Sequence, residues 1–339
     1  MVVNVGVNGL GVMGRHLIRA IKQQEKDGIL SEGEIEVVAF NDLYSADRLA
    51  PLLDFDSVYG KFDGKVEAAG KDIKIDGKII DGSAEKDVTK LNWGERGVDI
   101  VYESTGVFAK TPGVEGHIKT GAKKVLISAP SDFAEKTFIV GVNVDKYNGE
   151  KIISNASCTT NCLAPLALAL CKEIGPIVSG LMTTIHAYTN DQRLVDMPHS
   201  DIARAYAASL NLIPTSTGAA KAIGEVMPEL AGKMNGIAIR VPVPSVSLVD
   251  LTVSFEDNVT KGAINDAVKK AADSYLKGIL EYRNKETVST MILGNTYSSI
   301  FDATQTMTNG KMAKVLSWYD NVVGYSHRSV DLIKLIAEK

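Results

Sequence analysis

The chain has little cysteine, little proline and no strong excess of charge of either sign. Its 339 residues include three cysteines, at positions 158, 162 and 171, and ten prolines. Three clustered cysteines are too few for a disulfide scaffold and are typical of a reducing compartment, so we expect a cytoplasmic protein. The N-terminus has no basic stretch ahead of its apolar residues, which argues against a signal peptide.

Charge and hydropathy exclude further classes of protein. The 37 basic and 41 acidic residues give a net charge of -4 and are spread along the chain, so we expect no dedicated nucleic-acid or membrane partner. The longest uncharged run, residues 152–171, is polar in its first half and too short in its apolar part to span a bilayer. Hydrophobic residues make up 45%, as in soluble globular proteins, and the length predicts two domains of about 150 residues each.

The first 150 or so residues have the pattern of a nucleotide-binding domain. A valine-rich strand at 2–7, a helix at 15–21 and a strand at 35–40 form a βαβ unit. Further short apolar strands are predicted at 100–102, 124–127 and 138–140. Together they predict an α/β, Rossmann-type, doubly wound and mostly parallel sheet.

The pattern changes in the second half of the chain. Apolar and polar residues alternate over 249–255, which predicts a strand with one packed face in an antiparallel sheet. Residues 237–241 alternate in the same way and place Arg240 on the face opposite the apolar row. Helical spacing follows at 263–280 and at 329–337. We therefore predict an α+β second domain with a mostly antiparallel sheet.

A glycine motif follows the first predicted strand. Residues 9–14 have the pattern G-x-G-x-x-G between that strand and the predicted helix. In this context the glycines make the turn, admit a pyrophosphate and let the helix pack tightly on the sheet. Asp42 ends the second strand, where a carboxylate can bind the ribose of NAD and repel the extra phosphate of NADP. A glycine-rich turn without a ligand is the alternative.

Cys158 stands where a thiol can be activated. Ser157 and Cys158 precede the apolar run 163–170, so Cys158 is expected at or near a helix N-terminus. The helix dipole and a nearby imidazole can lower the pKa of a thiol from about 8.5, and we expect a lowered pKa here. Cys162 falls one turn further on the same side, so a metal or redox pair has to be considered, whereas Cys171 fits a core position. The scattered histidines argue against a zinc site.

His186 and several donors are candidates for the rest of a site. His186 ends the strand-like stretch 181–185, where an imidazole can serve as a base toward Cys158, although spacing alone favours a structural histidine. Arg204, Arg240 and the hydroxyl-rich turn 214–218 offer donors to an anionic substrate. For each arginine, a solvated surface charge is the alternative.

Five segments carry a resemblance to a known family. They are ISNASCTTNCLAP at 153–165, HAYTNDQR at 186–193, PTSTGAAKAIG at 214–224, RVP at 240–242 and WYDN at 318–321. Together they resemble phosphorylating glyceraldehyde-3-phosphate dehydrogenase over essentially the whole chain. The resemblance implies a homotetramer whose subunit has two domains. The NAD-binding domain would span 1–157, with a C-terminal helix at 322–339 packing back on it, and the catalytic domain would span 158–321.

The resemblance also implies a reaction and the residues that perform it. Cys158 attacks the aldehyde of glyceraldehyde 3-phosphate to form a hemithioacetal, and His186 takes the proton as hydride passes to NAD. Inorganic phosphate then cleaves the thioester to release 1,3-bisphosphoglycerate. The residues implied to bind the two phosphates are Thr189 and Arg240 for the substrate, Ser157, Thr159, Thr217 and Gly218 for inorganic phosphate, and Arg204 for both. The residues implied to contact NAD are Gly9, Gly11, Val12, Met13, Gly14, Asp42, Lys86, Ser128 and Asn321, the last orienting the carboxamide.

A few positions depart from the family's pattern. Residues 11–14 are Gly-Val-Met-Gly where relatives have Gly-Arg-Ile-Gly, so the contacts of that arginine side chain are absent while backbone contacts can persist. Residues 201–206 keep only Arg204 of three arginines common in bacterial relatives. Residues 321–324 are Asn-Val-Val-Gly instead of Asn-Glu-aromatic-Gly, which can change cofactor retention. Pro198, like Asp42, is consistent with a preference for NAD, because the NADP-using relatives usually differ at both positions.

Two other functions stay open from the sequence. A sibling enzyme that oxidises erythrose 4-phosphate shares the chemistry, although it usually lacks the segment STGAAK found here at 216–221. A non-catalytic NAD-binding or RNA-binding module that kept the fold is the alternative from another class. The presence of Cys158 and His186 and the near-neutral charge argue against such a module.

Overall fold

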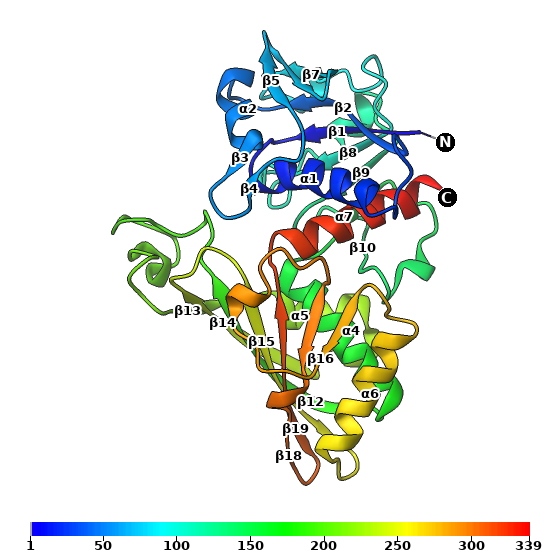
Figure 1. The fold of residues 1–339 in the computed structure, drawn as a ribbon, viewed down its shortest axis with the longest axis vertical. Helices are drawn as coiled ribbons and strands as arrows, with labels where there is room; N and C mark the ends of the chain where they lie inside the picture. The colour runs from blue at the N-terminus through cyan, green and yellow to red at the C-terminus, as the bar shows by residue number, and fades with distance from the viewer. Residues whose placement is uncertain (1) are drawn as a thin grey trace. The chain divides into compact units, whose positions relative to one another are not determined.

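The structure of the protein is a computed structural model that describes residues 2–339 (Figure 1). The chain divides into two compact units. The N-terminal unit comprises the residues up to Phe138 together with Lys146–Ala156 and Ser326–Lys339, and the C-terminal unit comprises Ile139–Asp145 and Ser157–Tyr325. Within the described residues, no helix combines the length and the apolar character that crossing a bilayer requires.

The N-terminal unit is built on a nine-stranded sheet in the order β10-β11-β9-β8-β1-β2-β7-β6-β5. The pairs from β10 to β7 are parallel, and β5, β6 and β7 pair antiparallel at one edge. The strands are β1 (Val3–Asn8), β2 (Ile35–Asn41), β5 (Val66–Ala69), β6 (Asp72–Ile75), β7 (Lys78–Ser83), β8 (Ile100–Glu103), β9 (Lys124–Ile127), β10 (Lys136–Thr137) and β11 (Ile152–Ser154), and a separate hairpin pairs β3 (Phe55–Asp56) with β4 (Gly60–Lys61). The predicted doubly wound, mostly parallel sheet is confirmed.

Helices α1 (Val12–Lys26), α2 (Ala46–Asp54), α3 (Gly116–Lys119) and α7 (Val323–Ala337) accompany this sheet, and the first turn of α7 is counted with the C-terminal unit. The prediction of a strand at residues 138–140 is wrong. The strand β10 ends at Thr137, after which the Ile139 N–H donates to the Asn143 side chain at 2.8 Å. Gly141 then adopts φ +81°, so the chain turns away from the sheet before a longer strand can form.

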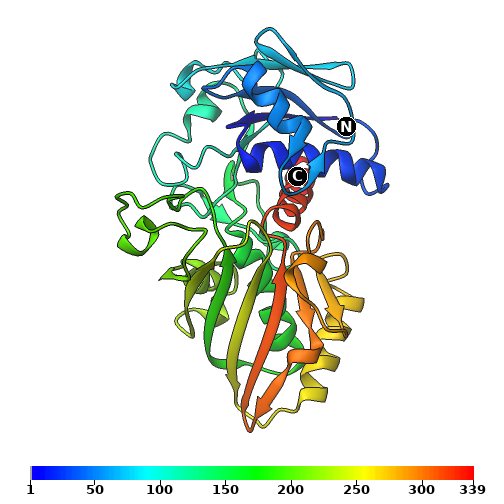
Figure 2. The same ribbon diagram turned by 60° about the vertical axis from the view of Figure 1, so that its left-hand side comes forward.

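The C-terminal unit contains an eight-stranded, mostly antiparallel sheet in the order β13-β14-β12-β15-β19-β17-β16, with β18 paired to β19. Its strands are β12 (Ile177–Ala187), β13 (Ile213–Ser216), β14 (Met234–Val241), β15 (Ser247–Phe255), β16 (Leu280–Arg283), β17 (Ser299–Asp302), β18 (Met307–Asn309) and β19 (Met312–Tyr319). Its helices are α4 (Cys158–Glu173), α5 (Ala219–Val226) and α6 (Lys261–Asp273), which contact the sheet and one another (Figure 2). The predicted α+β class is confirmed, although α6 ends before the predicted residue 280.

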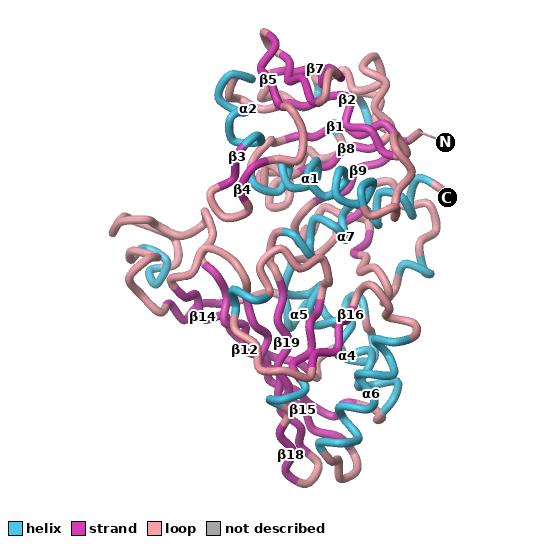
Figure 3. The backbone as a smooth tube through the Cα atoms, viewed as in Figure 1, coloured by secondary structure: helices cyan, strands magenta, loops and turns pink. Residues whose placement is uncertain are grey.

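Short 3-10 turns connect the longer elements of both units. They are η1 (Val88–Lys90), η2 (Val144–Lys146), η3 (Ile202–Ala205), η4 (Pro228–Leu230), η5 (Ser289–Met291) and η6 (Ala303–Gln305). The segment from 188 to 212, which connects β12 to β13, is almost entirely loop and is interrupted only by η3, as its mostly pink trace shows (Figure 3). This long loop carries two of the predicted site residues, Thr189 and Arg204.

The two faces of the C-terminal sheet differ in burial. The apolar row of β15, Val249 to Phe255, is buried as predicted. In β14 we expected the apolar row that begins at Ile237 to be packed. That row instead lies on the exposed face of the sheet, since Ile237 is 48% exposed and its neighbour Ala238 is buried. Arg240 shares the buried face of Ala238 and is the register partner of His186 in β12. The buried face of β14 therefore brings Arg240 beside His186, a contact that the alternation of residues 237–241 does not reveal.

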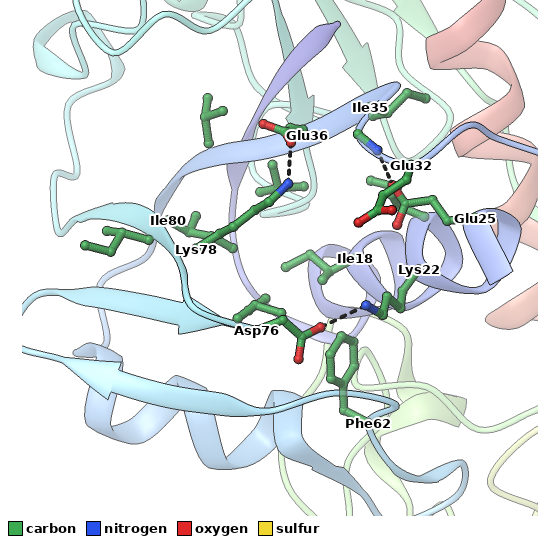
Figure 4. A pocket seen from close by; sticks show the side chains of 16 residues that line it. Ile18, Lys22, Glu25, Glu32, Ile35, Glu36, Phe62, Asp76, Lys78 and Ile80 are labelled. Carbon is green, nitrogen blue, oxygen red and sulfur yellow. Dashed lines mark hydrogen bonds and ion pairs between the residues drawn. The ribbon is translucent and has the colours of Figure 1, made fainter.

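A pocket of about 240 Å³ opens on the N-terminal unit between α1, β2 and the turn joining β6 to β7 (Figure 4). Ile18, Ile21 and Phe62 contribute to its apolar lining. Ion pairs of 2.8 Å between Lys22 and Asp76 and of 2.6 Å between Lys78 and Glu36 lie among the lining residues, which are Ile18, Ile21, Lys22, Glu25, Glu32, Gly33, Ile35, Glu36, Val37, Val38, Phe62, Ile75, Asp76, Lys78, Ile79 and Ile80. None of these residues belongs to the glycine motif, so this pocket is separate from the predicted cofactor site.

Candidate active site

The glycine motif forms the turn between β1 and α1. Gly9 adopts φ +91°, and its N–H donates to the Asn41 carbonyl at 2.8 Å. A Cβ on Gly14 would lie 2.3 Å from the Gly9 carbonyl oxygen, so only glycine fits beneath the turn. At Gly11, the N-cap of α1, a Cβ would find nothing within 4 Å. The turn therefore exposes backbone at a helix N-terminus, the arrangement that accepts a pyrophosphate.

Other nucleotide-site candidates follow the carboxyl ends of neighbouring strands. Asp42 follows β2, and its Oδ2 accepts the Leu10 N–H at 2.8 Å, so its carboxylate lies on the glycine turn. Ser128 follows β9, and the exposed Lys86 lies three residues beyond β7. Because β2 and β8 flank β1 on opposite sides, the strand order reverses here, which is where doubly wound sheets bind ligands. Val12 is 46% exposed in the same turn.

Cys158 is the first residue of α4. Ser157 is the N-cap, and its Oγ accepts the Thr160 N–H at 3.0 Å. Ala156, in the turn before it, has φ +53°, a conformation that residues with a Cβ rarely adopt. Strain of this kind costs about 1–3 kcal/mol and is concentrated at functional turns. The predicted position of Cys158 at a helix N-terminus is confirmed.

Cys158 and His186 face each other. The Cys158 Sγ lies 3.5 Å from the His186 Nε2. On the other side of the ring, Nδ1 lies 2.6 Å from the Ala187 carbonyl oxygen and 2.7 Å from the Arg240 Nη1. Tyr319 packs edge-on against the imidazole with ring centroids 6.0 Å apart. His186 is only 4% exposed, whereas Cys158 is partly exposed, so the imidazole is buried and the thiol can be reached from solvent.

Burial governs the protonation of this pair. Burial, and then the charges of Arg240 and Arg204, lower the pKa of His186 to about 3, so the imidazole is neutral at pH 7. Burial also raises the pKa of the Cys158 thiol, and Arg240 together with hydrogen bonds from Thr159 opposes this shift without reversing it. The prediction of a lowered thiol pKa is therefore wrong for the free chain.

The other two cysteines have surroundings unlike those of Cys158. Cys162 is fully buried, its Sγ lies 3.7 Å from both the Ser299 Oγ and the Ser317 carbonyl, and burial raises its pKa to about 12. Burial also raises the pKa of the half-buried Cys171. Among the described residues, no group of three or more His, Cys, Asp or Glu side chains is placed to hold a metal ion. Cys162 is thus an inert neighbour in the core.

The two arginines of the site differ in the hydrogen bonds that their guanidinium groups form. The Arg240 Nε is buried and has no hydrogen-bond partner within the described chain. Arg204 donates instead to the Thr215 hydroxyl, to the Ser216 carbonyl and to Asp191. Burial lowers the pKa of Arg240, and so does the charge of Arg204, whereas negative charge on Cys158 or Asp191 acts in the opposite sense. Arg204 is thus partly neutralised by Asp191 and Asp201, whereas Arg240 forms no ion pair within the described chain, and a buried guanidinium of this kind favours an anionic ligand.

The remaining phosphate candidates lie on turns and on α4. The Thr189 N–H donates to the Gln192 Oε1 at 3.2 Å. The Thr217 Oγ1 accepts the Ala219 N–H at 3.2 Å, and Gly218 is the N-cap of α5. The Thr159 side chain is buried, and its Oγ1 lies 2.8 Å from the Tyr319 hydroxyl. In the structure this threonine hydroxyl serves the packing of the site.

Some residues of the site carried no signal in the sequence analysis. Tyr319 bridges Thr159 and Thr184 through its hydroxyl, at 2.8 Å from each. Asp191 pairs with Arg204, although only the loop around it was noted. Asn321, by contrast, was predicted as a contact of the NAD carboxamide. Its Oδ1 accepts a hydrogen bond from the Ser247 Oγ at 3.3 Å. Partners of this kind are set by tertiary contacts and leave no local motif.

The fold and the family comparisons that follow define a class of protein, the NAD-dependent oxidoreductases. The family model described as the glyceraldehyde 3-phosphate dehydrogenase NAD binding domain matches residues 3–111, and the model of the C-terminal domain matches residues 157–321. The chain is 52% identical to glyceraldehyde-3-phosphate dehydrogenase of Geobacillus stearothermophilus and to glyceraldehyde-3-phosphate dehydrogenase 1 of Bacillus subtilis, over 100% of the chain and 99% of each relative. It is 51% identical over the same shares to glyceraldehyde-3-phosphate dehydrogenase of Mycobacterium tuberculosis. The chain belongs to the glyceraldehyde-3-phosphate dehydrogenase family.

Proposed function

We propose that this chain catalyses the NAD-dependent, phosphorylating oxidation of D-glyceraldehyde 3-phosphate to 1,3-bisphosphoglycerate in glycolysis. The observation that carries the proposal is the Cys158 Sγ at 3.5 Å from a neutral His186 Nε2, beside an arginine whose buried Nε has no partner in the described chain. A thiol, a base and an anion site are what thioester chemistry on a phosphorylated aldehyde requires.

The steps assign one role to each member of the pair. Cys158 gives its proton to His186 as its sulfur bonds to the aldehyde carbon. His186 then passes that proton to the former carbonyl oxygen, which completes the hemithioacetal and leaves the imidazole free to act again. His186 takes the hydroxyl proton as the hemithioacetal loses hydride and becomes a thioester, a step for which NAD held by the glycine turn would be the hydride acceptor. Inorganic phosphate then attacks the thioester carbon, the C–S bond breaks, and 1,3-bisphosphoglycerate leaves with the sulfur returned as Cys158.

The phosphate-binding roles follow the family. Arg240 and Thr189 would hold the substrate phosphate, and Arg204 would be shared by both phosphates. The residues that would hold inorganic phosphate are Ser157, Thr159, Thr217 and Gly218. The cationic pair supports these assignments, since Arg204 perturbs both Arg240 and His186 electrostatically. Arg204 would have to share its guanidinium between Asp191 and a phosphate.

The cofactor roles rest on the glycine turn. Backbone groups of residues 9–14 would cradle the pyrophosphate, and Asp42 would bind the adenosine ribose. Lys86 and Ser128 would lie along the cofactor, and Asn321 would hold the carboxamide. The domain division that we propose is residues 1–157 with the helix 322–339 for NAD and residues 158–321 for catalysis.

A phosphate-dependent assay tests the proposal. We expect NADH formation from glyceraldehyde 3-phosphate that requires inorganic phosphate and is lost in Cys158→Ala. Turnover that is indifferent to phosphate would contradict the phosphorylating chemistry, and a higher kcat/KM for erythrose 4-phosphate would assign the sibling activity. Nucleic-acid binding without any turnover would point to a non-catalytic module, and equal use of NADP would refute the role of Asp42.

We also propose a cytoplasmic homotetramer. Support comes from the open face of the C-terminal sheet, where Leu181 is 67% and Ile237 is 48% exposed. Apolar side chains gathered on one exposed face mark interaction surfaces. Light scattering of the purified protein should give four subunits, and Leu181→Lys should lower that number.

A further inference from the structure

A chain of buried, hydrogen-bonded side chains that the proposed reaction does not use lies beside the glycine turn of the N-terminal unit. Its centre is Glu103, the last residue of β8, which is the register partner of Asn8 at the end of β1. All members are at most 5% exposed, and they are Asn8, Asn41, Trp93, Glu103 and His117. A buried carboxylate is costly unless hydrogen bonds compensate for the lost water, so the partners of Glu103 define what it does.

Both oxygen atoms of the Glu103 carboxylate receive hydrogen bonds. Its Oε1 accepts the Thr105 N–H at 2.8 Å and also the Thr105 hydroxyl. Its Oε2 lies 2.6 Å from the Asn8 Nδ2 and 3.1 Å from the His117 Nε2. Four donors around one side chain match the acceptor capacity of an ionised carboxylate, and an amide of the same size has only one oxygen to offer them.

Trp93 and Asn41 determine which atoms donate to Glu103. The Trp93 Nε1–H can only donate, and it points at the His117 Nδ1 at 2.9 Å, so the proton of this ring stands on Nε2 and faces Glu103. The Asn41 Nδ2 donates to the Asn8 Oδ1 at 2.8 Å, which leaves the Asn8 NH2 group for Glu103. The Asn41 amide is itself oriented by a backbone N–H that donates to its Oδ1 at 2.8 Å.

The network joins segments of the candidate cofactor site that are far apart in the sequence. Directly after Glu103, the Ser104 Oγ donates to the Gly9 carbonyl at 2.7 Å, so the loop that follows β8 lies on the glycine turn. On the other side, the Asn41 carbonyl accepts the Gly9 N–H at 2.8 Å, and Asp42 comes next in the chain. The glycine turn is therefore held between the ends of β8 and β2, and the buried side chains tie these two strand ends together.

We propose that Glu103 is a positioning residue for NAD, which keeps the glycine turn and Asp42 at the spacing that the dinucleotide requires. Groups that bind a ligand keep their geometry when a supporting shell of hydrogen bonds locks them. Glu103 and His117 are buried, so they act without touching the cofactor, and His117 acts through Glu103. The inference rests on the proposed roles of the glycine turn and Asp42.

Calorimetric titration of the full chain with NAD tests the inference. Glu103→Gln keeps the size of the side chain but sets one acceptor oxygen and an NH2 group against four donors, so the Kd for NAD should rise about tenfold or more. In turnover the KM for NAD should rise with it, whereas kcat at saturating NAD and the KM for glyceraldehyde 3-phosphate should stay within about twofold of the native values.

Position 117 offers a matched pair of variants. In His117→Gln the new amide can accept from the Trp93 Nε1–H and donate to Glu103, so the Kd for NAD should stay within about twofold of the native value. His117→Leu can do neither, and its Kd should rise about three- to tenfold. Urea unfolding of each variant measures stability separately, and if Glu103→Gln does not fold, the pair at position 117 decides.

The outcomes separate positioning from a purely structural role. Native affinity for NAD in Glu103→Gln and His117→Leu, with only stability lowered, overturns the inference, and so does an equal loss of affinity in His117→Gln and His117→Leu. If the native chain itself does not bind NAD, the cofactor role of the glycine turn fails and the inference fails with it. The other contradicting results leave that role intact, so the two failures are distinguished.

Discussion

The glycine turn of the N-terminal unit and the thiol site of the C-terminal unit are assembled in different ways. The turn is local, since six consecutive residues form it and Asp42 joins it through a backbone N–H of the turn itself. The thiol site takes Cys158 from a helix and His186 and Arg240 from two paired strands. A local site can be recognised from its motif, whereas the properties of an assembled site depend on register and burial that no motif encodes.

Removing the thiol should have the largest effect. Cys158→Ala is expected to lower the rate of NADH formation by at least about 10³-fold, because no other group forms the covalent intermediate. Cys171→Ser is the matched control, since Cys171 is half-buried and not in contact with His186. Activity that survives in Cys158→Ala, or disappears in Cys171→Ser, would place the nucleophile elsewhere.

Two glycines of one turn should separate folding from binding. Gly14→Ala would place a Cβ 2.3 Å from the Gly9 carbonyl oxygen, so we expect a loss of stability of about 3 kcal/mol or more. In Gly11→Ala the new Cβ meets nothing within 4 Å. The free energy of unfolding of this variant should lie within a few tenths of a kcal/mol of that of the native chain, while its affinity for NAD falls about tenfold. Urea unfolding and calorimetric titration with NAD measure both quantities, and equal effects of the two changes would refute the distinction.

Neutralising the acid at the glycine turn should change cofactor choice. Asp42→Asn keeps an oxygen for the Leu10 N–H but loses the charge, so the preference of kcat/KM for NAD over NADP should fall about tenfold to 100-fold. An unchanged ratio would show that Asp42 serves the turn alone.

Buried histidines in the two units should make stability depend on pH. The pKa of His186 is lowered to about 3 and that of His327 in α7 to about 4, chiefly by burial. Each binds its proton more tightly when unfolded, so stability rises with pH between the folded value and about 6.5 and is lost as pH falls through that window. Each histidine contributes a slope of up to about 1.4 kcal/mol per pH unit. The free energy of unfolding would be measured between pH 6.5 and pH 4.5. His186→Asn and His327→Gln should each reduce its dependence on pH, and an unchanged slope would contradict the lowered pKa of that histidine.

The smallest effect is expected at the departure from the family within the glycine turn. Val12 is exposed, so Val12→Arg should fold normally and add a positive charge beside the pyrophosphate site. Solvent-exposed ion pairs contribute about 0.2–1 kcal/mol, and NAD should bind up to about fivefold more tightly. A weaker affinity in calorimetry would mean that the side chain obstructs the cofactor.

The features that could be predicted from the sequence are the local ones, and those that could not are assembled from distant segments. The parallel sheet, the glycine turn, Asp42 at the end of β2 and Cys158 at the start of α4 all rest on local patterns, and the structure shows each of them. The packed face of β14 was assigned wrongly because Ile237, although apolar, lies on the open side of the sheet. The pKa of Cys158 was assigned wrongly because burial outweighs the helix terminus and Arg240. Tyr319 and Asp191 were missed since their roles exist only once strands and loops have met.

The covalent intermediate is the most direct test of the central claim, that Cys158 with His186 carries a phosphorylating oxidation. The native chain would be mixed with glyceraldehyde 3-phosphate and NAD without phosphate, and its intact mass and peptide masses would be measured. We predict one 3-phosphoglyceroyl group per subunit, on Cys158, formed together with one NADH and released when inorganic phosphate is added. An adduct on Cys162 or Cys171, or an adduct that phosphate does not remove, would contradict that claim.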